Sequence, residues 1–373
     1  FFDGARLRVG PRSAGADPGP ACYRRGGPLT ITDCNVLLGR VQPAFFPAIF
    51  GPNADEPLDR AIVAERFATL CSEIEAKTER ALSPEKAAEG FLRIANESMA
   101  EAIKKISIQR GYNPTEYALV AFGGAGGQHA CAVADAVGVE TILLHPLAGV
   151  LSAWGIGLAD VRQLSESTIE QKLDATLQLE KRVRSWALAV GGGLQGAVRT
   201  SVTANLKYEG ADSTLPIAFG GIDEMTAAFE AEHLKRFGFN DPGRSIIVGS
   251  LSLESLAHMP VEQSAPAPIE KGAGGPSVVS LHIDGAEQRA PAYRRGALSP
   301  NHSFEGPALI IEQGATTYVA PGWRAAMNAH GDVILTRTQR IERNAVGTAA
   351  DPILLEVFNN RFMGVAEEMG LAL

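Results

Sequence analysis

The residues best suited to chemistry lie in the stretch VAFGGAGGQHA, where five small residues, Gly123 to Gly127, stand between an apolar run and an Ala-rich amphipathic segment. Glycine has no Cβ atom, so a flat or anionic ligand can approach the backbone of such a turn. Free N–H groups at the start of the following helix would face that ligand. The spacing does not name the ligand, and close packing of a helix against a strand is the alternative explanation of these glycines.

Two common phosphate-binding motifs do not fit this turn. A dinucleotide-binding fingerprint needs G-x-G-x-x-G and an acidic residue at the end of the second strand. Counted from Gly124, the third glycine position is His129, and the second strand ends at His145-Pro146. A P-loop needs Gly-Lys followed by Ser or Thr, whereas Gly127 is followed by Gln-His. The first motif is disfavoured and the second is excluded.

The composition indicates a soluble globular enzyme. The 373 residues are 45% hydrophobic, and without an apolar run of about 18 residues they predict no membrane span. The net charge of −8 and the absence of a Lys/Arg run argue against a nucleic-acid partner. The four cysteines form no C-x-x-C pair and the seven histidines are scattered, so we expect neither a metal centre nor a disulfide framework. A cytoplasmic location fits this composition.

Apolar periodicity predicts the elements that would position the glycine turn. Helical spacing recurs from Leu58 to Ile74, and a second helix runs from Ser83-Pro84 to a stop at Gly111. The runs YALVAFGG and VETILLHP resemble buried strands on either side of a helix from Gln128 to Val137, which Gly138 ends. The predicted unit is strand, loop, helix, strand, and a right-handed crossover between neighbouring parallel strands is compatible with it.

The rest of the sequence predicts loops and smaller elements. The first stretch, about 55 residues rich in Gly and Pro, is typical of loop. After GLADVR we expect a helical stretch to about Leu188, an alternating strand in SVTANLKYEG, a helix near 222–237 and a strand near 245–253. VEQSAPAPIEKGAGGPS is a linker by composition. PALIIEQGATTYVAPGW and AAMNAHGDVILTR predict short strands of a β-rich cap, with Trp323 in its core.

The two ends of the sequence suggest a piece of a longer chain. The sequence begins at Phe1 rather than Met and shows no signal peptide. The tail DPILLEVFNNRFMGVAEEMGLAL opens with Asp351 as an N-cap and Pro352 as the first helical residue, and it stops on apolar residues without a C-terminal cap. We therefore expect a severed helix, with a natural terminal helix docked on the body as the alternative.

Four stretches together resemble the hydantoinase/oxoprolinase family. In family order they are VGPRSAGADPGPACYRRGGPLTITDCNVLLGR, AFGGAGGQHACAVADAVG followed by GVLSAWGIGLADV, LKYEGADSTL, and GPALIIEQGATTYVAPGW. The tail DPILLEVFNNRFMGVAEEMG is similar to the opening of the family's hydantoinase B region, so the resemblance covers almost the whole chain. QHACA, and ITDCNVLLGR before FFPAIFGPN, look most like the members that open 5-oxoproline.

The resemblance implies an α/β fold: part of an actin/hexokinase-like (ribonuclease H-like) ATPase lobe, then a small α+β unit and a β-rich C-terminal cap. Residues 1–163 would be the hydantoinase A ATPase-like region without its N-terminal lobe. Residues 164–260 and 277–340 would be the α+β and β-rich parts of the A region's C-terminal domain, and residues 350–373 the start of the B region. The family's two phosphate-binding hairpins are missing, so the isolated chain is expected to hydrolyse little or no ATP.

The family's activity implies a role for the glycine turn. ATP with Mg²⁺ would phosphorylate the amide oxygen of the 5-oxoproline lactam, and water would then open it to L-glutamate, with the B region in cis supporting hydrolysis. In actin-like folds a late Gly-Gly turn borders the adenosine. The residues expected to bind the cofactor are Gly123, Gly124, Ala125, Gly126, Gly127 and, unless it only caps and packs, His129.

The other candidate site residues are carboxylates and a tyrosine. Of Asp17 and Asp33, in the glycine-rich opening, we expect Asp33 to be the catalytic-site residue, as an indirect Mg²⁺ or loop-orienting group. An Asx-type turn or a helix cap is the alternative role of Asp33. Tyr208, Glu209 and Asp212 in KYEGAD stand at a strand end, either on a substrate-facing loop or on a solvated hairpin tip. No residue is assigned as a metal ligand.

Several functions stay open at this point. The leading one is opening of the 5-oxoproline lactam, and within the same family a hydantoin or a ketone is the alternative substrate. A different possibility is a non-catalytic piece whose large apolar surfaces need further chain to cover them. The intact protein would take a small molecule, bind neither nucleic acid nor membrane, and form a homo-oligomer.

Overall fold

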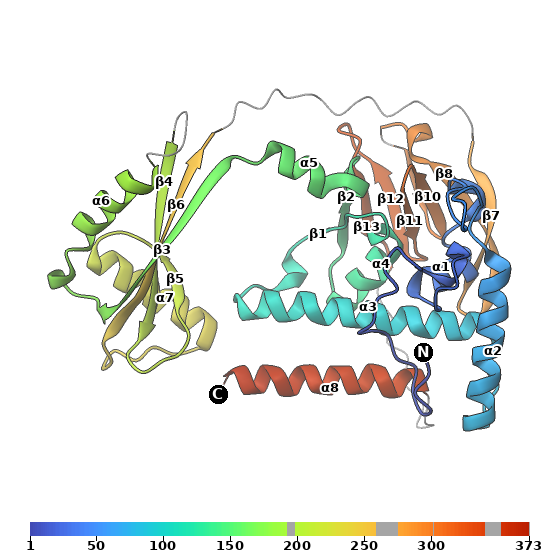
Figure 1. Cartoon of the computed structure of the whole chain (residues 1–373), viewed down its shortest axis with the longest axis horizontal. Coiled ribbons are helices and arrows are strands. Elements are labelled where there is room, and N and C mark those ends of the chain that lie inside the picture. The colour runs from blue at the N-terminus through green and yellow to red at the C-terminus, as the bar shows by residue number, and fades with distance from the viewer. Residues whose placement is uncertain (192–197, 259–274, 301, 340–351, 373) are drawn as a thin grey trace. The chain divides into compact units, whose positions relative to one another are not determined.

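A computed structural model of the chain describes residues 1–191, 198–258, 275–300, 302–339 and 352–372. The chain folds as two compact units (Figure 1). Unit 1 comprises Phe1–Ile108, Tyr112–Ser152 and Ala265–Leu373. Unit 2 comprises Gln109–Gly111 and Ala153–Ser264.

Two β-sheets form the centre of unit 1. The five-stranded sheet has the order β1 (Leu119–Val120), β2 (Thr141–Leu144), β13 (Val333–Arg337), β12 (Trp323–Met327) and β9 (Ser303–Glu305). The four-stranded sheet has the order β11 (Ala315–Val319), β10 (Ala308–Glu312), β8 (Ala286–Arg294) and β7 (Ser277–Ile283). Strand β1 pairs parallel with β2, an arrangement with which the sequence pattern was compatible, and β2 pairs antiparallel with β13. Segments far apart in the sequence therefore share one sheet.

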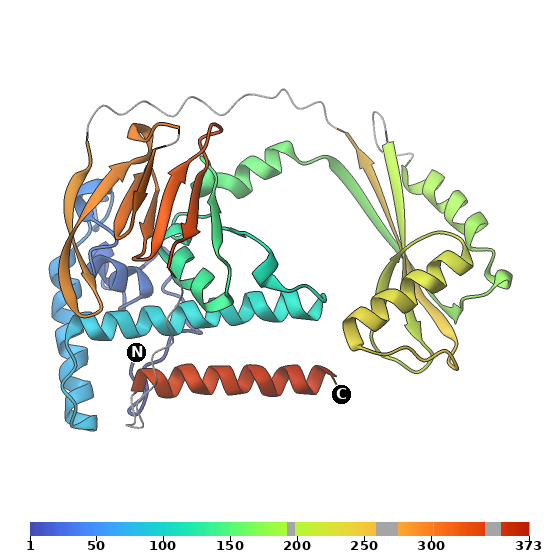
Figure 2. The same cartoon turned by 180° about the vertical axis from the view of Figure 1, so that it is seen from behind.

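Helices and short 3₁₀ turns surround these sheets. Helix α4 (Gly126–Val137) connects β1 to β2 and packs on β11, and the long helix α3 (Pro84–Gln109) runs past the ends of the strands in both views (Figures 1 and 2). The start of α3 at Pro84 and the left-handed Gly138 after α4, with φ 91°, confirm the predicted signals. The other elements of unit 1 are α1 (Ile31–Leu37), α2 (Arg60–Thr78), η1 (Ala21–Tyr23), η2 (Pro43–Phe45), η3 (Pro114–Glu116), η4 (Ala148–Val150) and η6 (Arg295–Ala297). Helix α5 (Leu151–Leu158) begins in unit 1 and continues into unit 2.

Helix α8 (Pro352–Ala372) begins at the predicted proline and lies beside α3 (Figures 1 and 2). The Ile353 side chain fills the space over Gly90 of α3. Arg361 pairs with Glu97 of α3, with 2.7 Å between Nη2 and Oε1. The predicted N-cap, Asp351, lies outside the described residues.

Unit 2 is an antiparallel sheet with two helices on one face. The strand order is β3 (Val161–Lys172), β6 (Ile246–Ala257), β4 (Val198–Tyr208) and β5 (Leu215–Ala218), and the helices are α6 (Leu179–Gly191) and α7 (Ile222–Phe237), with η5 (Ala175–Leu177) before α6. Ala204, Leu206 and Tyr208 of β4 are buried beneath these helices, as their alternation predicts. The helix predicted near 222–237 is confirmed.

Two local predictions were wrong. Residues 161–172 form strand β3, where we expected the beginning of a helical stretch. Most side chains of β3 are exposed, because it is an edge strand, so the sequence there lacks the apolar alternation of a half-buried strand. The opening segment was expected to be loop, yet it contains α1, which begins with a capping box between Thr30 and Asp33.

The long-range organisation also differs from the expected one. We grouped residues 277–340 with 164–260 as a C-terminal domain, whereas the described strands of 277–337 lie in unit 1 with β1 and β2. The reason is that β13 and β12 extend the sheet that β1 and β2 begin. Trp323 of β12 is 0% exposed in the core between this sheet and α4, as predicted. Most of the predicted linker at 261–277 lies outside the described residues, which exclude 259–274.

Candidate functional site

The predicted glycine turn joins the end of β1 to the start of α4. The N–H of Ala121 donates to the Leu143 carbonyl at 3.0 Å, which holds the turn against β2. Gly123 has φ 86°, a left-handed conformation that favours glycine, and its N–H donates to the Ala148 carbonyl at 2.7 Å. Because the Gly126 N–H then donates to the Gly123 carbonyl at 3.2 Å, the turn is tight and the helix starts at once.

The tip of this turn is open to solvent. Gly124 and Ala125 are exposed, whereas Gly127 is buried. Among the described residues, the N–H groups of Gly124, Ala125 and Gly127 have no acceptor. They lie at the N-terminal end of α4, where the helix dipole favours negative charge or hydrogen-bond acceptors. A ligand with acceptor atoms can therefore reach this backbone.

Three backbone segments of small residues meet at the turn. A Cβ atom built on Gly124 would stand 2.8 Å from the Gly314 carbonyl oxygen, in the turn between β10 and β11. One built on Gly149 would contact Ala315 at 3.9 Å, and one built on Gly127 would collide with Thr317 of β11. Close packing accounts for the glycine at position 127 and leaves little room for a side chain at position 124, whereas ligand contact at the turn stays a prediction. Gly127 allows close packing of α4 on β11, and Gly124 belongs to the exposed tip.

Large apolar side chains stand exposed beside this tip. Val120 is 48% exposed, Phe122 54% and Val150 58%. Phe122 directly precedes the turn, and Val150 follows the Ala148 carbonyl that holds it. A flat apolar group with acceptor atoms at its edge would suit free N–H groups beside apolar side chains.

His129, in the first turn of α4, points one edge of its ring into unit 1. Its Nδ1 lies 2.8 Å from Oδ1 of Asn96 on α3, and it is 8% exposed. Burial, followed by the nearby charge of Arg40, lowers the pKa of His129 to about 4. The ring is therefore neutral near pH 7, and if Nδ1 carries the proton for Asn96, Nε2 is an acceptor.

Asp33 lies at the start of α1 in a different hydrophobic cluster from the glycine turn. Its carboxylate is fully buried and accepts hydrogen bonds from the N–H groups of Ala21, Cys22 and Thr30, at 2.8–3.1 Å, and from the Thr30 hydroxyl at 2.9 Å. Three of these bonds end on Oδ2 and one on Oδ1, so Asp33 orients η1 and the first turn of α1. Its site role stays a prediction.

The predicted substrate residues belong to unit 2. Tyr208 is 4% exposed, its ring meets Phe229 edge-on at 5.0 Å, and its hydroxyl accepts a hydrogen bond from the Asp241 N–H at 3.1 Å. Glu209 and Asp212 are exposed, and Glu209 pairs with Lys172 at 3.6 Å. Tyr208 is thus part of a hydrophobic core, and only the two carboxylates face solvent. Their contact with a substrate stays a prediction.

Residues 1–165 match the family model described as hydantoinase/oxoprolinase. A 5-oxoprolinase of Pestalotiopsis fici is 36% identical over 99% of this chain. The chain belongs to the hydantoinase/oxoprolinase family. Other relatives of this hydantoinase/oxoprolinase chain are 5-oxoprolinase 1 of Arabidopsis thaliana and the 5-oxoprolinase of Saccharomyces cerevisiae, which are 33% and 34% identical over 100% and 98% of it. The chain spans 30–31% of the length of these three proteins.

Solved structures of two enzymes share the fold of this hydantoinase/oxoprolinase chain. An ATP-dependent caprolactamase from Pseudomonas jessenii superposes with a TM-score of 0.71 and 26% identity, over 91% of this chain and 51% of that one. An acetone carboxylase superposes with a TM-score of 0.62 and 21% identity, over 89% of this chain and 51% of that one. The fold is therefore α/β, and its structural relatives are consistent with an actin/hexokinase-like ATPase fold.

A groove in unit 1 of this hydantoinase/oxoprolinase chain was not predicted. Its volume is about 690 Å³, and it runs between α3, α4 and the turn joining β7 to β8. Asp135 of α4 lines it, pairing with Arg337 at 3.0 Å and accepting a hydrogen bond from Trp323 Nε1 at 3.1 Å. Burial, opposed by Arg337, raises the pKa of Asp135 to about 6. No local sequence motif predicts this groove, because the residues that line it come from separate segments of the chain.

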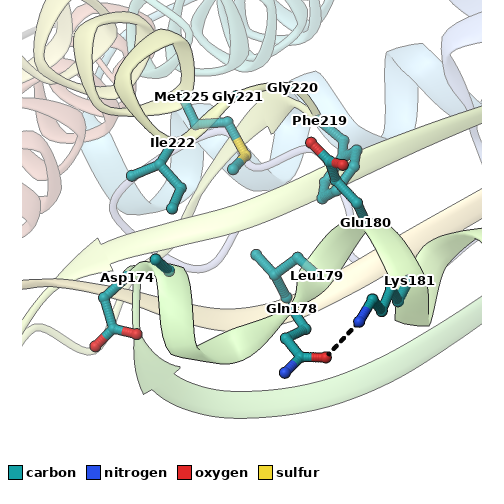
Figure 3. Close-up of a pocket in the computed structure, with 11 residues that line it drawn as sticks. Asp174, Gln178, Leu179, Glu180, Lys181, Phe219, Gly220, Gly221, Ile222 and Met225 are labelled. Atoms are coloured by element: carbon teal, nitrogen blue, oxygen red, sulfur yellow. Dashed lines mark hydrogen bonds between the residues drawn. The ribbon is translucent and has the colours of Figure 1, made fainter.

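A smaller cavity lies within unit 2 (Figure 3). Its volume is about 300 Å³, and Ile222 and Met225 of α7 stand across it from Leu179 of α6. Lys181 donates from Nζ to Gln178 Oε1 at 3.3 Å at its edge. None of the predicted substrate residues lines this cavity, so the cavity gives no support to their predicted contact with a substrate.

The described residues hold no group of three or more His, Cys, Asp or Glu side chains suited to a metal ion. The four cysteines are buried free thiols, and burial raises the pKa of Cys131 to about 12 and of Cys71 to about 11. In the described part of the chain, none of the helices is both long and apolar enough to cross a membrane.

Proposed function

We propose that this chain is part of an ATP-dependent hydrolase that opens the lactam of 5-oxoproline to L-glutamate. The observation that carries the proposal is that relatives named 5-oxoprolinase match it along nearly its whole length. A lactam is a poor electrophile because amide resonance delocalises the nitrogen lone pair into the carbonyl group. ATP would supply the activating chemistry, by transfer of its terminal phosphoryl group to the amide oxygen.

In this proposal the glycine turn binds the nucleoside end of ATP. The exposed tip at Gly124 and Ala125 offers free N–H donors, and Phe122 and Val150 offer apolar surface to the base. Gly127 lets the first turn of α4 pack closely on β11, which fixes the start of the helix beside the exposed tip. The donor set therefore fits a base or ribose better than a triphosphate, because no lysine or arginine lies within Gly123–Gly127.

The described residues do not fit a Mg²⁺ site. They contain no cluster of potential ligands, and the oxygens of Asp33 are already occupied by four hydrogen bonds. We therefore assign no step in the reaction to a metal held by this chain. The parts that bind the phosphates and any metal would come from other regions of the protein, since relatives are about three times as long.

A hydantoinase B region in cis is the second part of this proposal. We assign residues 352–372, helix α8, to the beginning of that region and residues 1–163 to the ATPase-like region. Helix α8 carries several exposed large apolar side chains, including Phe362 at 72% and Met369 at 63%. Such a surface is typical of an interface that further chain covers.

A different lactam is the second candidate substrate. The caprolactamase subunit alpha of Pseudomonas jessenii is 28% identical over 90% of this chain, and the solved caprolactamase shares its fold. Caprolactam carries no carboxylate, whereas 5-oxoproline does. The two candidates therefore differ in charge, and a substrate series separates them.

The test uses the whole open reading frame that contains residues 1–373. The expressed protein is assayed for ADP release with 5-oxoproline, caprolactam, hydantoin and acetone, each with and without bicarbonate. We expect ADP and glutamate to form in equal amounts with 5-oxoproline alone. Turnover of caprolactam in preference to 5-oxoproline would favour the second candidate, and ketone turnover that needs bicarbonate would overturn the hydrolase.

A further inference from the structure

The groove beside α4 is lined by an arginine, Arg40, that has no partner in the described part of the chain. Arg40 lines it, between the end of α1 and the edge strand β7. Among the described residues, Arg40 has no hydrogen-bond acceptor and no carboxylate partner, and its Nε is enclosed. The guanidinium lies over the ring of Tyr318, 4.4 Å from its centroid. Partial burial of a cation without a counter-charge costs free energy. Arg40 is therefore a strong candidate for binding an anionic ligand.

The backbone holds Arg40 in this position. The His282 N–H donates to the Leu38 carbonyl at 3.0 Å, and the Gln42 side chain donates to the Gly39 carbonyl at 2.6 Å. Gly39 has φ 75°, and a Cβ there would collide with the Ser280 carbonyl oxygen of β7. The segment therefore lies tightly along β7 on both sides of Arg40, which fixes the direction in which the side chain leaves.

Three carboxylates of the groove already have partners. Asp135 pairs with Arg337, and Glu97 pairs with Arg361 of α8 at 2.7 Å. Glu89 accepts a hydrogen bond from the Gly285 N–H at 3.2 Å. The fourth carboxylate, Asp284, is exposed in the turn between β7 and β8. These three carboxylates are thus engaged by groups other than Arg40.

The balance of charges in the groove limits the charge of the anion that it can bind. Besides Arg40 and Arg337, the cations that line the groove are Lys86 and Arg93, both exposed on α3. The groove thus holds four cations and four carboxylates, so its formal charges cancel. A polyphosphate would meet the four carboxylates without a net attraction, whereas a single carboxylate needs only one forked donor.

Apolar side chains complete the lining. Leu82, Ala136 and Ile283 face the groove together with Ile353 of α8. A volume of about 690 Å³ that combines apolar walls with charged side chains is within the range of small-molecule sites.

We propose that this groove binds a small organic monocarboxylate, with the Arg40 guanidinium receiving the carboxylate and the apolar walls receiving the rest of the molecule. The binding itself is independent of ATP. The further step, that the natural occupant is the carboxylate-bearing lactam 5-oxoproline, rests on the proposed function. Arg40 would then select a charged lactam over a neutral one.

Calorimetric titration of the full chain without nucleotide tests this site. The ligands are 5-oxoproline, cyclopentanecarboxylate, 2-pyrrolidinone, which is 5-oxoproline without its carboxylate, and inorganic phosphate. We expect both carboxylates to bind and 2-pyrrolidinone to bind at least 10-fold more weakly. Equal affinity for 5-oxoproline and 2-pyrrolidinone, tighter binding of phosphate, or no binding of either carboxylate at millimolar concentration would overturn the proposal.

Two substitutions and a control separate recognition from packing. Arg40→Gln should weaken carboxylate binding about 10- to 100-fold, because a charge-assisted hydrogen bond is lost. Arg40→Lys keeps the charge without the fork and should give an intermediate loss. Arg12→Gln, at an exposed arginine outside the groove, should change nothing. Thermal unfolding of each variant checks folding, and unchanged carboxylate affinity in a folded Arg40→Gln chain would mean that Arg40 only packs on Tyr318.

The result is distinguishable from the test of the proposed function. A chain that binds 5-oxoproline through Arg40, in a full-length protein that does not hydrolyse it, would keep the groove and reject the activity. If the Arg40→Gln variant of the full-length protein hydrolyses 5-oxoproline with the wild-type rate and KM, the activity stands, and 5-oxoproline is rejected as the natural occupant of the groove.

Discussion

The imidazole Nδ1 of His129 lies 2.8 Å from the amide oxygen of Asn96, and this bond ties the first turn of α4 to the middle of α3. Asn96 also lines the groove that Arg40 borders. The glycine turn and the groove thus lie at two places along the same helix, α4, with His129 between the turn and the lining residue Asp135.

Two groups on α4 give the unfolding free energy opposite pH dependences. The pKa of His129 is lowered to about 4, so between about pH 4 and 6.5 only the unfolded chain binds this proton, and stability falls as the pH falls. The pKa of Asp135 is raised to about 6. Between about pH 4 and 6 the folded chain holds the Asp135 proton and the unfolded chain does not, so stability rises as the pH falls.

Single substitutions should reveal each slope. On going from pH 7 to pH 5, His129→Gln should gain about 2 kcal/mol of stability relative to the wild type, and Asp135→Asn should lose about 1 kcal/mol. Urea unfolding at the two pH values measures both differences. If the unfolding free energy of His129→Gln depends on pH as that of the wild type does, the pKa of the buried imidazole is not lowered in the folded chain.

Gly127 should be intolerant of a side chain for packing reasons. Its Cβ would collide with Thr317, so Gly127→Ala should lower the free energy of unfolding by about 1–3 kcal/mol. Gly126→Ala is the matched control, because the nearest atom to its Cβ would be 3.9 Å away and alanine favours the helix. Chemical denaturation of the two variants decides, and equal stabilities would contradict close packing of α4 on β11.

Asp33 should matter for stability more than for metal dependence. Asp33→Asn turns one acceptor oxygen into a donor among four hydrogen-bond donors, so we expect a loss of about 3 kcal/mol in unfolding free energy. Asp59→Asn is the control, since asparagine caps α2 nearly as well as aspartate and should cost under about 1 kcal/mol. If Asp33→Asn instead shifted the Mg²⁺ requirement of the full-length enzyme without loss of stability, Asp33 would be a site residue.

A carboxylate introduced at the turn should raise the stability of the chain and weaken nucleotide binding. Ala125 is the N-cap of α4 without a side-chain cap, so Ala125→Asp should stabilise the chain by about 0.5–1 kcal/mol through the free N–H groups. The same change should weaken ATP binding by the full-length protein about 10-fold, because those donors are taken. Gly221→Asp adds the same charge at the N-cap of α7 in unit 2 and should leave ATP affinity unchanged. ATP titration of both variants measures this, and undiminished affinity in Ala125→Asp would exclude the turn from the nucleotide site.

The sequence by itself determined the local elements. Pro84 and Pro352 mark helix starts, Gly138 ends α4, and the alternation from Val202 to Tyr208 marks a strand with one buried face. These signals are local, because caps, proline and side-chain periodicity act within a few residues. The glycine turn and its place before a helix were predictable for the same reason.

Only the tertiary structure decided which distant segments meet. Leu335 pairs with Ile142 in one sheet, although the family resemblance placed them in separate domains, because the unpaired edge of a strand does not encode its partner. Arg40 came to the groove in the same way, through the contact of Gly39 with β7. Spacing along the chain records neither the burial of Arg40 nor its lack of a counter-charge among the described residues, since both depend on which segments the folded chain brings beside it.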